Sequence, residues 1–117
     1  MEAASNVLRS GEVEVHPADG LVRVGGRVVA MSMRELRLLS ALVEREGRIV
    51  SRADLYRIAW GAPLRDGDRS VDVYVHKLRV KLEEALPGHA FIHTHFGFGY
   101  RFSPEPSHAF HNGDPGA

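Results

Sequence analysis

The strongest constraint on the fold is a helical pattern that runs from about Arg69 to Leu86 and is halted by Pro87-Gly88. Apolar residues recur in this segment at the spacing of one helix face, namely Val71, Val75, Leu78, Leu82 and Ala85. The pattern predicts a long amphipathic helix that packs one stripe of side chains against a core. Its opposite face is then left for solvent or for a partner.

Two shorter helices are predicted before this long one. Ser32-Met-Arg-Glu35 has the pattern of a capping box, so the first helix begins at Met33, and Gly47 ends it. Its expected core-facing residues are Leu36, Leu39, Leu42 and Val43. Ser51-Arg-Ala-Asp54 begins the second helix, which stops at Trp60-Gly61. We expect this second helix to bury Leu55, Ile58 and Ala59.

Strand patterns lie on both sides of the helices. Residues 7–31 predict an antiparallel meander, with turn residues at Pro17–Gly20 and a hairpin signal at Gly25-Gly26. A very short strand is expected at Ile49-Val50, between the first two helices. Near the end of the chain, Phe91–His95 and Gly99–Phe102 predict a closing hairpin around Phe96-Gly97-Phe98.

The order of these elements predicts an α+β fold, a winged helix-turn-helix domain over residues 7–102. Within it, residues 7–31 form the sheet, and residues 32–102 form three helices and the hairpin. Residues 1–6 lack periodicity and residues 103–117 are rich in breakers, so both ends are expected to be disordered.

Composition excludes several classes of function. The chain has no cysteine, which excludes a disulfide scaffold, thiol catalysis and a cysteine-based zinc site. No catalytic Ser, His and Asp signature is present, and Gly97-Phe-Gly99 is not followed by the helix that a phosphate loop needs. We therefore expect neither an enzyme nor a cofactor. No membrane-length apolar run and no signal-peptide pattern occur, which predicts a cytoplasmic protein without membrane partners.

Net charge argues at first against a nucleic-acid partner, because 15 Lys and Arg balance 15 Asp and Glu. The long helix departs from this balance, since Arg69–Leu82 holds four basic residues against one acid, Asp72. Its outer face carries Val73, His76, Lys77 and Val80, flanked by Tyr74, Arg79 and Lys81. Lysine donates to guanine, valine contacts the thymine methyl group, and arginine binds phosphates. The alternative is an ordinary solvated helix face.

Four stretches in this order resemble the OmpR/PhoB-type DNA-binding domain, the effector half of many bacterial two-component response regulators. They are Met33–Leu39, Val50–Leu55 with Trp60-Gly61, Asp68–Leu82, and Gly97-Phe-Gly-Tyr-Arg-Phe102. The resemblance covers about residues 12–102. It implies a four-stranded N-terminal antiparallel sheet, three helices and a C-terminal β-hairpin wing.

The resemblance also implies a mode of action. The third helix enters the major groove of double-stranded DNA, and the wing, residues 91–102, reaches the adjacent backbone or minor groove. Family members bind direct repeats as head-to-tail pairs without a cofactor. They contact RNA polymerase through the loop that is Gly61–Asp68 here, with Ala62, Leu64, Arg65 and Asp66 as the expected contacts.

Position by position, the resemblance implies a set of DNA contacts. Arg69 and Thr94 match phosphate contacts, and Tyr100 matches the tyrosine of the terminal signature. The full expected set is Arg69, Val73, Tyr74, His76, Lys77, Arg79, Val80, Lys81, Thr94, Phe96 and Tyr100. Asp72 is expected to orient Arg79 rather than to contact DNA.

Three positions depart from the family pattern, because His76, Val80 and Phe96 stand where basic residues are common. At the wing, Phe96 or Phe98 is expected to pack on sugars or to cover the hairpin. These departures leave open a winged-helix module that docks on RNA polymerase or another regulator and hardly contacts DNA. A weaker alternative is a metal-responsive regulator that uses His93 and His95, with His89 nearby.

Overall fold

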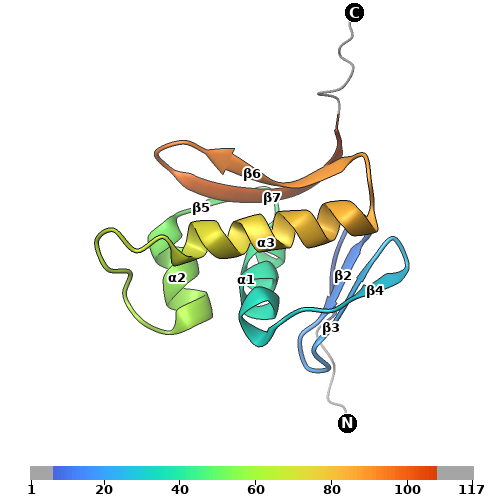
Figure 1. The fold of residues 1–117 in the computed structure, drawn as a ribbon, viewed down its shortest axis with the longest axis horizontal. Helices are drawn as coiled ribbons and strands as arrows, with labels where there is room; N and C mark the ends of the chain where they lie inside the picture. The colour runs from blue at the N-terminus through green and yellow to red at the C-terminus, as the bar shows by residue number, and fades with distance from the viewer. Residues whose placement is uncertain (1–6, 108–117) are drawn as a thin grey trace, which may run out of the picture.

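The computed structural model describes residues 7–107, and it confirms the predicted fold class. Three helices lie between two antiparallel sheets, and α3 runs along the wing on one side of the molecule (Figure 1). The elements are β1 (Leu8–Ser10), β2 (Val13–His16), β3 (Leu21–Val24), β4 (Arg27–Val29), α1 (Met33–Glu44), β5 (Ile49–Val50), α2 (Arg52–Trp60), α3 (Ser70–Ala85), β6 (His89–His95) and β7 (Gly99–Pro106). Disorder was predicted for residues 1–6 and 103–117, of which 1–6 and 108–117 lie outside the described residues. For residues 103–106 the prediction is wrong, because they form the end of β7.

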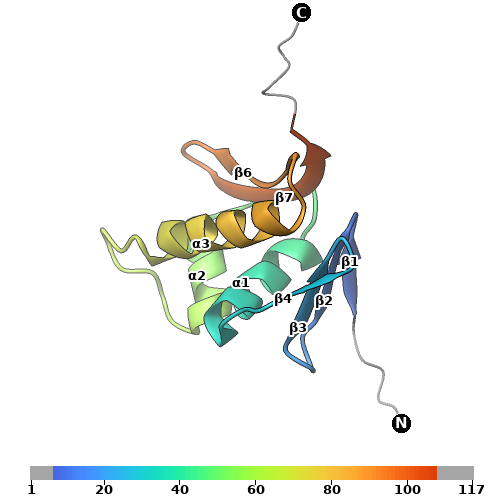
Figure 2. The ribbon, with the colours of Figure 1, turned by 45° about the vertical axis from the view of Figure 1, so that its right-hand side comes forward.

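The N-terminal sheet is the expected meander, with strand order β1-β2-β3-β4. Alternate residues of β2 and β3 are fully buried and turn one face of the sheet toward α1 (Figure 2). The hairpin between β3 and β4 is made by Gly25 and Gly26, whose φ angles of 57° and 81° favour glycine.

Both short helices begin as predicted. The Ser32 hydroxyl accepts a hydrogen bond from Glu35 N at 3.1 Å, and the Ser32 amide donates to Glu35 Oε1 at 2.7 Å, which completes the capping box. Ser51 caps α2, and Gly61 ends it in the left-handed conformation. The prediction that Ile58 is buried is wrong. This nine-residue helix buries only Leu55 and Ala59, so its core-facing stripe is narrower than expected.

The long helix and the wing also follow the pattern. Val71, Val75, Leu78 and Leu82 of α3 are fully buried. Strand β7 lies between β5 and β6, and a side chain at Gly99 would overlap the backbone carbonyl of Val50. The wing hairpin is longer than predicted, because β7 continues past Phe102 to Pro106 and Ala90 pairs with Glu105. Strand β5 pairs only with Tyr100 and Arg101, so the edge of β7 beyond them tolerates prolines, which lack an N–H.

Within residues 7–107, no helix has both the length and the apolar character needed to cross a membrane.

Candidate nucleic-acid interface

The outer face of α3 is a solvent-exposed surface that packs against no other described element. Val73, His76, Lys77 and Val80 are all exposed on it, while the opposite face of the helix forms the core. Arg69, Asp72, Val73, His76 and Lys77 line a shallow, open hollow over the first half of the helix. The prediction from helical periodicity therefore holds for the exposure of these residues, and they form one continuous surface.

Lys77 is oriented on this face by aromatic packing. Its Nζ lies 4.6 Å from the centre of the Tyr74 ring, within the range of a cation–π contact. The Tyr74 ring packs edge-on against Trp60 at 5.4 Å, and Trp60 stacks on Tyr56 at 4.8 Å. Tyr74 is half-buried in this cluster, so its ring orients Lys77 and joins α3 to α2.

Asp72 joins three elements, and the prediction that it orients Arg79 is wrong. Its carboxylate accepts hydrogen bonds from Arg52 Nε at 2.7 Å, from Arg69 Nε at 3.1 Å and from the Tyr100 hydroxyl. Burial alone would raise the pKa of Asp72, but the hydrogen bonds from Tyr100 and Arg52 outweigh it and lower that pKa. Arg79 lies elsewhere because it turns toward β6.

Tyr100, one of the expected DNA contacts, is buried beside Asp72. Its side chain is only 4% exposed, and burial together with the Asp72 carboxylate raises its pKa. Arg69, by contrast, is 79% exposed and accessible from the outer face of α3. Arg52 was given no role by sequence analysis, because its partners Asp72 and Tyr100 lie far along the chain and no local pattern marks the contact.

Arg79 and Thr94, both expected at phosphates, bind each other. Arg79 Nη2 donates to Thr94 Oγ1 at 2.7 Å and to the Ile92 carbonyl at 2.9 Å, and its Nε donates to that carbonyl at 3.1 Å. These bonds fasten α3 to strand β6. Thr94 accepts the bond from Arg79, so its own hydroxyl hydrogen remains available to an acceptor such as a phosphate oxygen.

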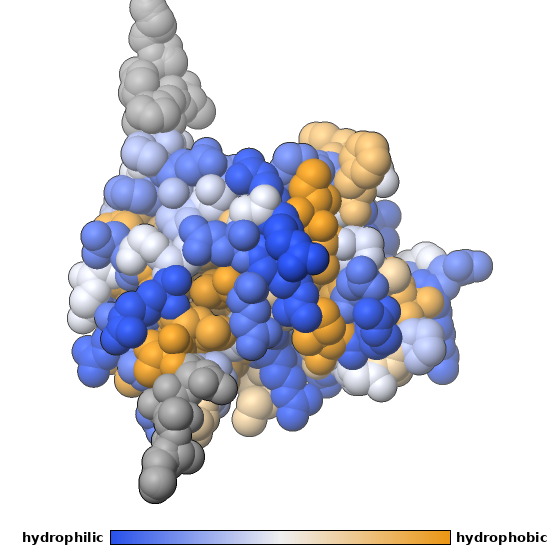
Figure 3. Space-filling model, turned by 180° about the vertical axis from the view of Figure 1, so that it is seen from behind, coloured by the Kyte–Doolittle hydropathy of each residue, from blue (hydrophilic) through white to orange (hydrophobic). Residues whose placement is uncertain are grey.

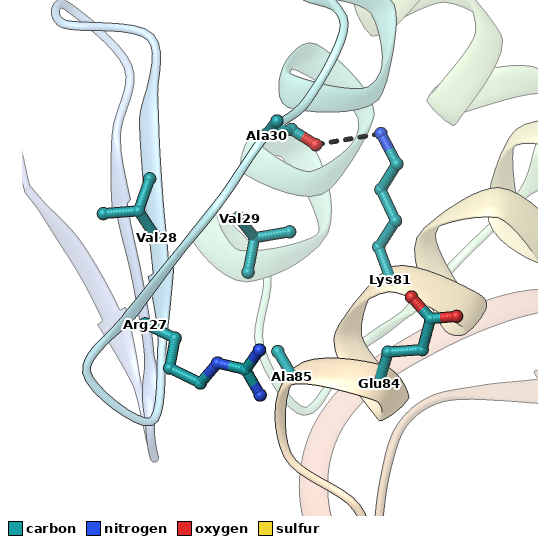
Figure 4. A pocket seen from close by; sticks show the side chains of 7 residues that line it. All are labelled: Arg27, Val28, Val29, Ala30, Lys81, Glu84 and Ala85. Carbon is teal, nitrogen blue, oxygen red and sulfur yellow. Dashed lines mark hydrogen bonds between the residues drawn. The ribbon is translucent and has the colours of Figure 1, made fainter.

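Lys81 is turned away from the outer face. Its Nζ donates to Glu35 Oε1 at 2.7 Å and to the Ala30 carbonyl at 2.9 Å, at the end of a groove between β4 and the second half of α3 (Figure 4). Glu35 is buried, which would raise its pKa, but the bonds from Lys81 and Ser32 lower it overall. Lys81 thus connects α3 with the start of α1.

The loop between α2 and α3 is exposed and fixed at both ends. Gly61 caps α2, and the Asp68 carboxylate accepts a hydrogen bond from the Ser70 amide at 2.8 Å. Ala62, Arg65 and Asp66 are exposed, and Leu64 is half-buried. The loop therefore has the accessibility that a protein contact requires.

The tip of the wing carries two uncovered aromatic side chains. Phe96 is 87% exposed and Phe98 is 72% exposed. Behind the tip, Arg101 Nε donates to His95 Nε2 at 3.0 Å, and His93 Nε2 lies 2.8 Å from the Ser103 carbonyl. Among residues 7–107, no three His, Asp or Glu side chains converge as a metal site would require.

Comparisons with known proteins identify the class of this domain. Residues 26–102 match the family described as "Transcriptional regulatory protein, C terminal", and the chain belongs to this family. Membership confirms the predicted resemblance to OmpR/PhoB-type effector domains. It also confirms the prediction of a transcriptional regulatory domain rather than an enzyme.

Individual relatives agree with this assignment. The chain is 36% identical over 90 residues to the transcriptional regulatory protein YvrH of Bacillus subtilis. The matched region is 77% of this chain and 38% of YvrH. Its structure is similar to the DNA-binding domain of CpxR from E. coli, with a TM-score of 0.76, 27% identity, and coverage of 85% of this chain and 97% of that one. It is also similar to the Klebsiella pneumoniae RstA DNA-binding domain solved in complex with the RstA box, with a TM-score of 0.75, 31% identity, and coverage of 84% and 97%. The chain spans less than half the length of the first curated relatives that it matches.

Proposed function

We propose that this domain binds double-stranded DNA sequence-specifically by placing α3 in the major groove. The observation that carries the proposal is the outer face of α3, where hydrogen-bonding and apolar side chains are exposed together on a rigid helix. Such a face matches the mixed donors, acceptors and methyl groups of the major groove. The similarity to an RstA domain solved in complex with its DNA box supports DNA as the partner.

The proposed contacts divide into two kinds. Lys77, His76, Val73 and Val80 contact base edges, because they occupy the centre of the exposed face. Arg69 and the Thr94 hydroxyl bind phosphates at the flank. Arg79, Tyr74, Tyr100 and Lys81 position these groups through their bonds within the protein and do not themselves determine specificity.

Lys77→Ala is the variant that tests this assignment. Loss of a bidentate contact to guanine is expected to cost about 1–3 kcal/mol and to relax specificity at that base pair. Arg23→Ala is the matched control, since it removes one exposed cation from the N-terminal sheet. Fluorescence anisotropy with a selected duplex and a scrambled duplex, across a salt series, measures both effects. Equal, weak binding to both duplexes without a salt slope would contradict the proposed sequence-specific binding and its phosphate contacts.

The proposal extends to the assembly on DNA. Two copies bind a direct repeat head to tail, in the cytoplasm, as the OmpR/PhoB-type resemblance implies. Native mass spectrometry of the domain with one half-site and with two tandem half-sites counts the bound copies. One copy on the tandem duplex at saturation would contradict the paired arrangement.

The loop between α2 and α3 is the proposed contact for RNA polymerase, because Ala62, Leu64, Arg65 and Asp66 project between two fixed helix ends. Charge reversal by Arg65→Glu with Asp66→Lys is expected to abolish transcription activation or polymerase binding without a change in DNA affinity. The alternative, a module that docks on polymerase with little DNA binding, predicts that Lys77→Ala leaves regulation intact.

A further inference from the structure

The wing ends in an apolar tip that shields no core. Phe96 and Phe98 are the two most exposed large apolar side chains among the described residues, and only Gly97 separates them. The turn is tight, since the Phe98 amide donates to the His95 carbonyl at 2.8 Å and Gly97 has a φ of 83°. Seen from behind, the segment stands out from the surface as an apolar knob at upper right (Figure 3).

Two sets of bonds fix this tip relative to α3. Tyr100, two residues after Phe98, is bonded to Asp72 in the first turn of α3. Thr94, two residues before Phe96, is bonded to Arg79. The tip therefore projects beside the first half of α3 (Figures 1 and 2), next to the surface that carries Arg69, Val73 and His76. Any duplex held against that surface lies within reach of the tip.

The chemistry of the tip favours an apolar contact with DNA over a contact with phosphate charges. From Thr94 to Tyr100 the chain has no Lys or Arg, and Arg101 is paired with His95 and Glu105. The two exposed rings lie at the very end of the hairpin, and a single aromatic ring is thin enough to enter the minor groove, which is about 6 Å wide. Phenylalanine is among the residues that wedge between base steps there and bend the duplex.

A protein partner is a poorer match for this feature. Two phenylalanines bury about 300–500 Å² between them. A stable interface between proteins buries about 800 Å² on each partner. The neighbouring positions add little further apolar area, because His95 is paired with Arg101 and Gly99 has no side chain.

We propose that Phe96 and Phe98 form an aromatic wedge that enters the minor groove beside the α3 site and opens a flexible base step. This inference rests on the proposed DNA binding and specifies how the wing takes part in it. Pyrimidine–purine steps such as TA unstack most easily, so the wedge adds a sequence preference at a position that α3 does not contact. It also bends the DNA away from the wing, toward the major groove.

The test uses the 117-residue chain and the tightest duplex selected from a randomised library. The double variant Phe96→Ser with Phe98→Ser is compared with Met33→Ser, which alters an exposed apolar residue on α1, away from the wing. Three properties are measured: affinity across a salt series, DNA bending by end-to-end energy transfer, and fluorescence of 2-aminopurine placed at the TA step. Both altered side chains in the double variant are exposed, so it is expected to fold.

The wedge predicts that the double variant binds about tenfold more weakly and loses both the bend and the 2-aminopurine signal. The salt slope is expected to stay unchanged, because no charge is removed. Met33→Ser behaves as the unaltered chain. Unchanged affinity and bending in the double variant overturn the wedge and leave the proposed DNA binding in place. A loss of self-association without DNA, in place of a loss of bending, assigns the tip to a contact between copies and also overturns it. Failure of the unaltered chain to bind any duplex overturns both proposals.

Discussion

Tyr100→Phe tests whether the hydrogen bond to Asp72 couples the wing to α3. The substitution removes one hydroxyl that is bonded to the carboxylate of Asp72 and keeps the buried ring in place. A hydrogen bond to a charged group contributes about 1.5–3 kcal/mol. Asp72 retains Arg52 and Arg69 as partners and is partly exposed, so we expect a loss near the lower end, about 1–2 kcal/mol. For a domain of this size that corresponds to a fall in Tm of about 5–10 °C.

The pH dependence of this loss gives a stricter test. Burial opposes ionisation of Asp72, but the bonds from Tyr100 and Arg52 lower its pKa in the folded protein. A lowered folded pKa stabilises the protein above the unfolded pKa of aspartate, about 3.9, and this contribution is lost as pH falls through the folded pKa. Because Tyr100→Phe raises the folded pKa of Asp72, the stability gap is full near neutral pH. It shrinks as the pH falls below the ordinary aspartate range.

Urea unfolding from neutral to acidic pH measures this gap directly. Tyr74→Phe is the control, since it removes another tyrosine hydroxyl from a half-buried ring for which residues 7–107 supply no hydrogen-bond partner. Its expected effect is within about 0.5 kcal/mol. If Tyr100→Phe were as stable as the unaltered chain, or if its deficit did not change with pH, the carboxylate of Asp72 would not be what Tyr100 stabilises.

Three further changes probe the frame that holds the interface. Lys81→Met leaves the buried carboxylate of Glu35 without its ammonium partner. The free energy of unfolding in urea is expected to fall by about 2–3 kcal/mol, which is less than for a fully buried ion pair because Lys81 is partly exposed. Adding Glu35→Gln to that variant removes the unpaired charge but keeps an acceptor for the Ser32 amide, so it should recover part of the loss. A further loss would contradict the ion-pair explanation. Gly99→Ala forces a side chain onto the Val50 carbonyl at a φ of 143°, so we expect the free energy of unfolding to fall by about 2 kcal/mol or more. Gly67→Ala is the control, because its side chain would lie in open space and its effect reports the cost of a positive φ alone. Thr94→Val removes the acceptor of the Arg79 bond and should cost about 1 kcal/mol, with weaker DNA binding measured by anisotropy and an unchanged fold by circular dichroism.

Local signals allowed most of the fold to be predicted from the sequence. The capping box at Ser32, the glycine after Trp60 and the apolar stripe of α3 each depend on residues within a few turns of one helix. The full length of the wing was not predicted. Strand β7 continues past Phe102 because it pairs with β6, but the two prolines in that stretch hide the strand pattern in the sequence. Strand ends of this kind depend on pairing between distant residues and leave only a weak pattern in the sequence.

The interface was predictable in its exposed part only. Periodicity placed Val73, His76, Lys77 and Val80 on one face, and the structure has them there. Periodicity could not tell which charged side chains of α3 are already bonded within the protein. Asp72 contacts Arg52 and Tyr100, which are 20 and 28 positions away, and Lys81 contacts Glu35 at a distance of 46 positions. Such pairs form only after the helices and the wing have packed.

These internal bonds explain how a chain without net charge can still have an exposed cation at the proposed DNA interface. Arg69 is bonded to Asp72 at the exposed surface, where an ion pair contributes about 1 kcal/mol at most. When a phosphate replaces Asp72 as the partner of Arg69, the carboxylate keeps its bonds from Arg52 and Tyr100 and is not left unpaired. Transfer of Arg69 to the backbone of DNA is therefore nearly free of cost to the fold. In the free domain the Asp72 carboxylate thus orients Arg69 at the start of α3. When Arg69 binds a phosphate, Asp72 still fixes the wing through Tyr100.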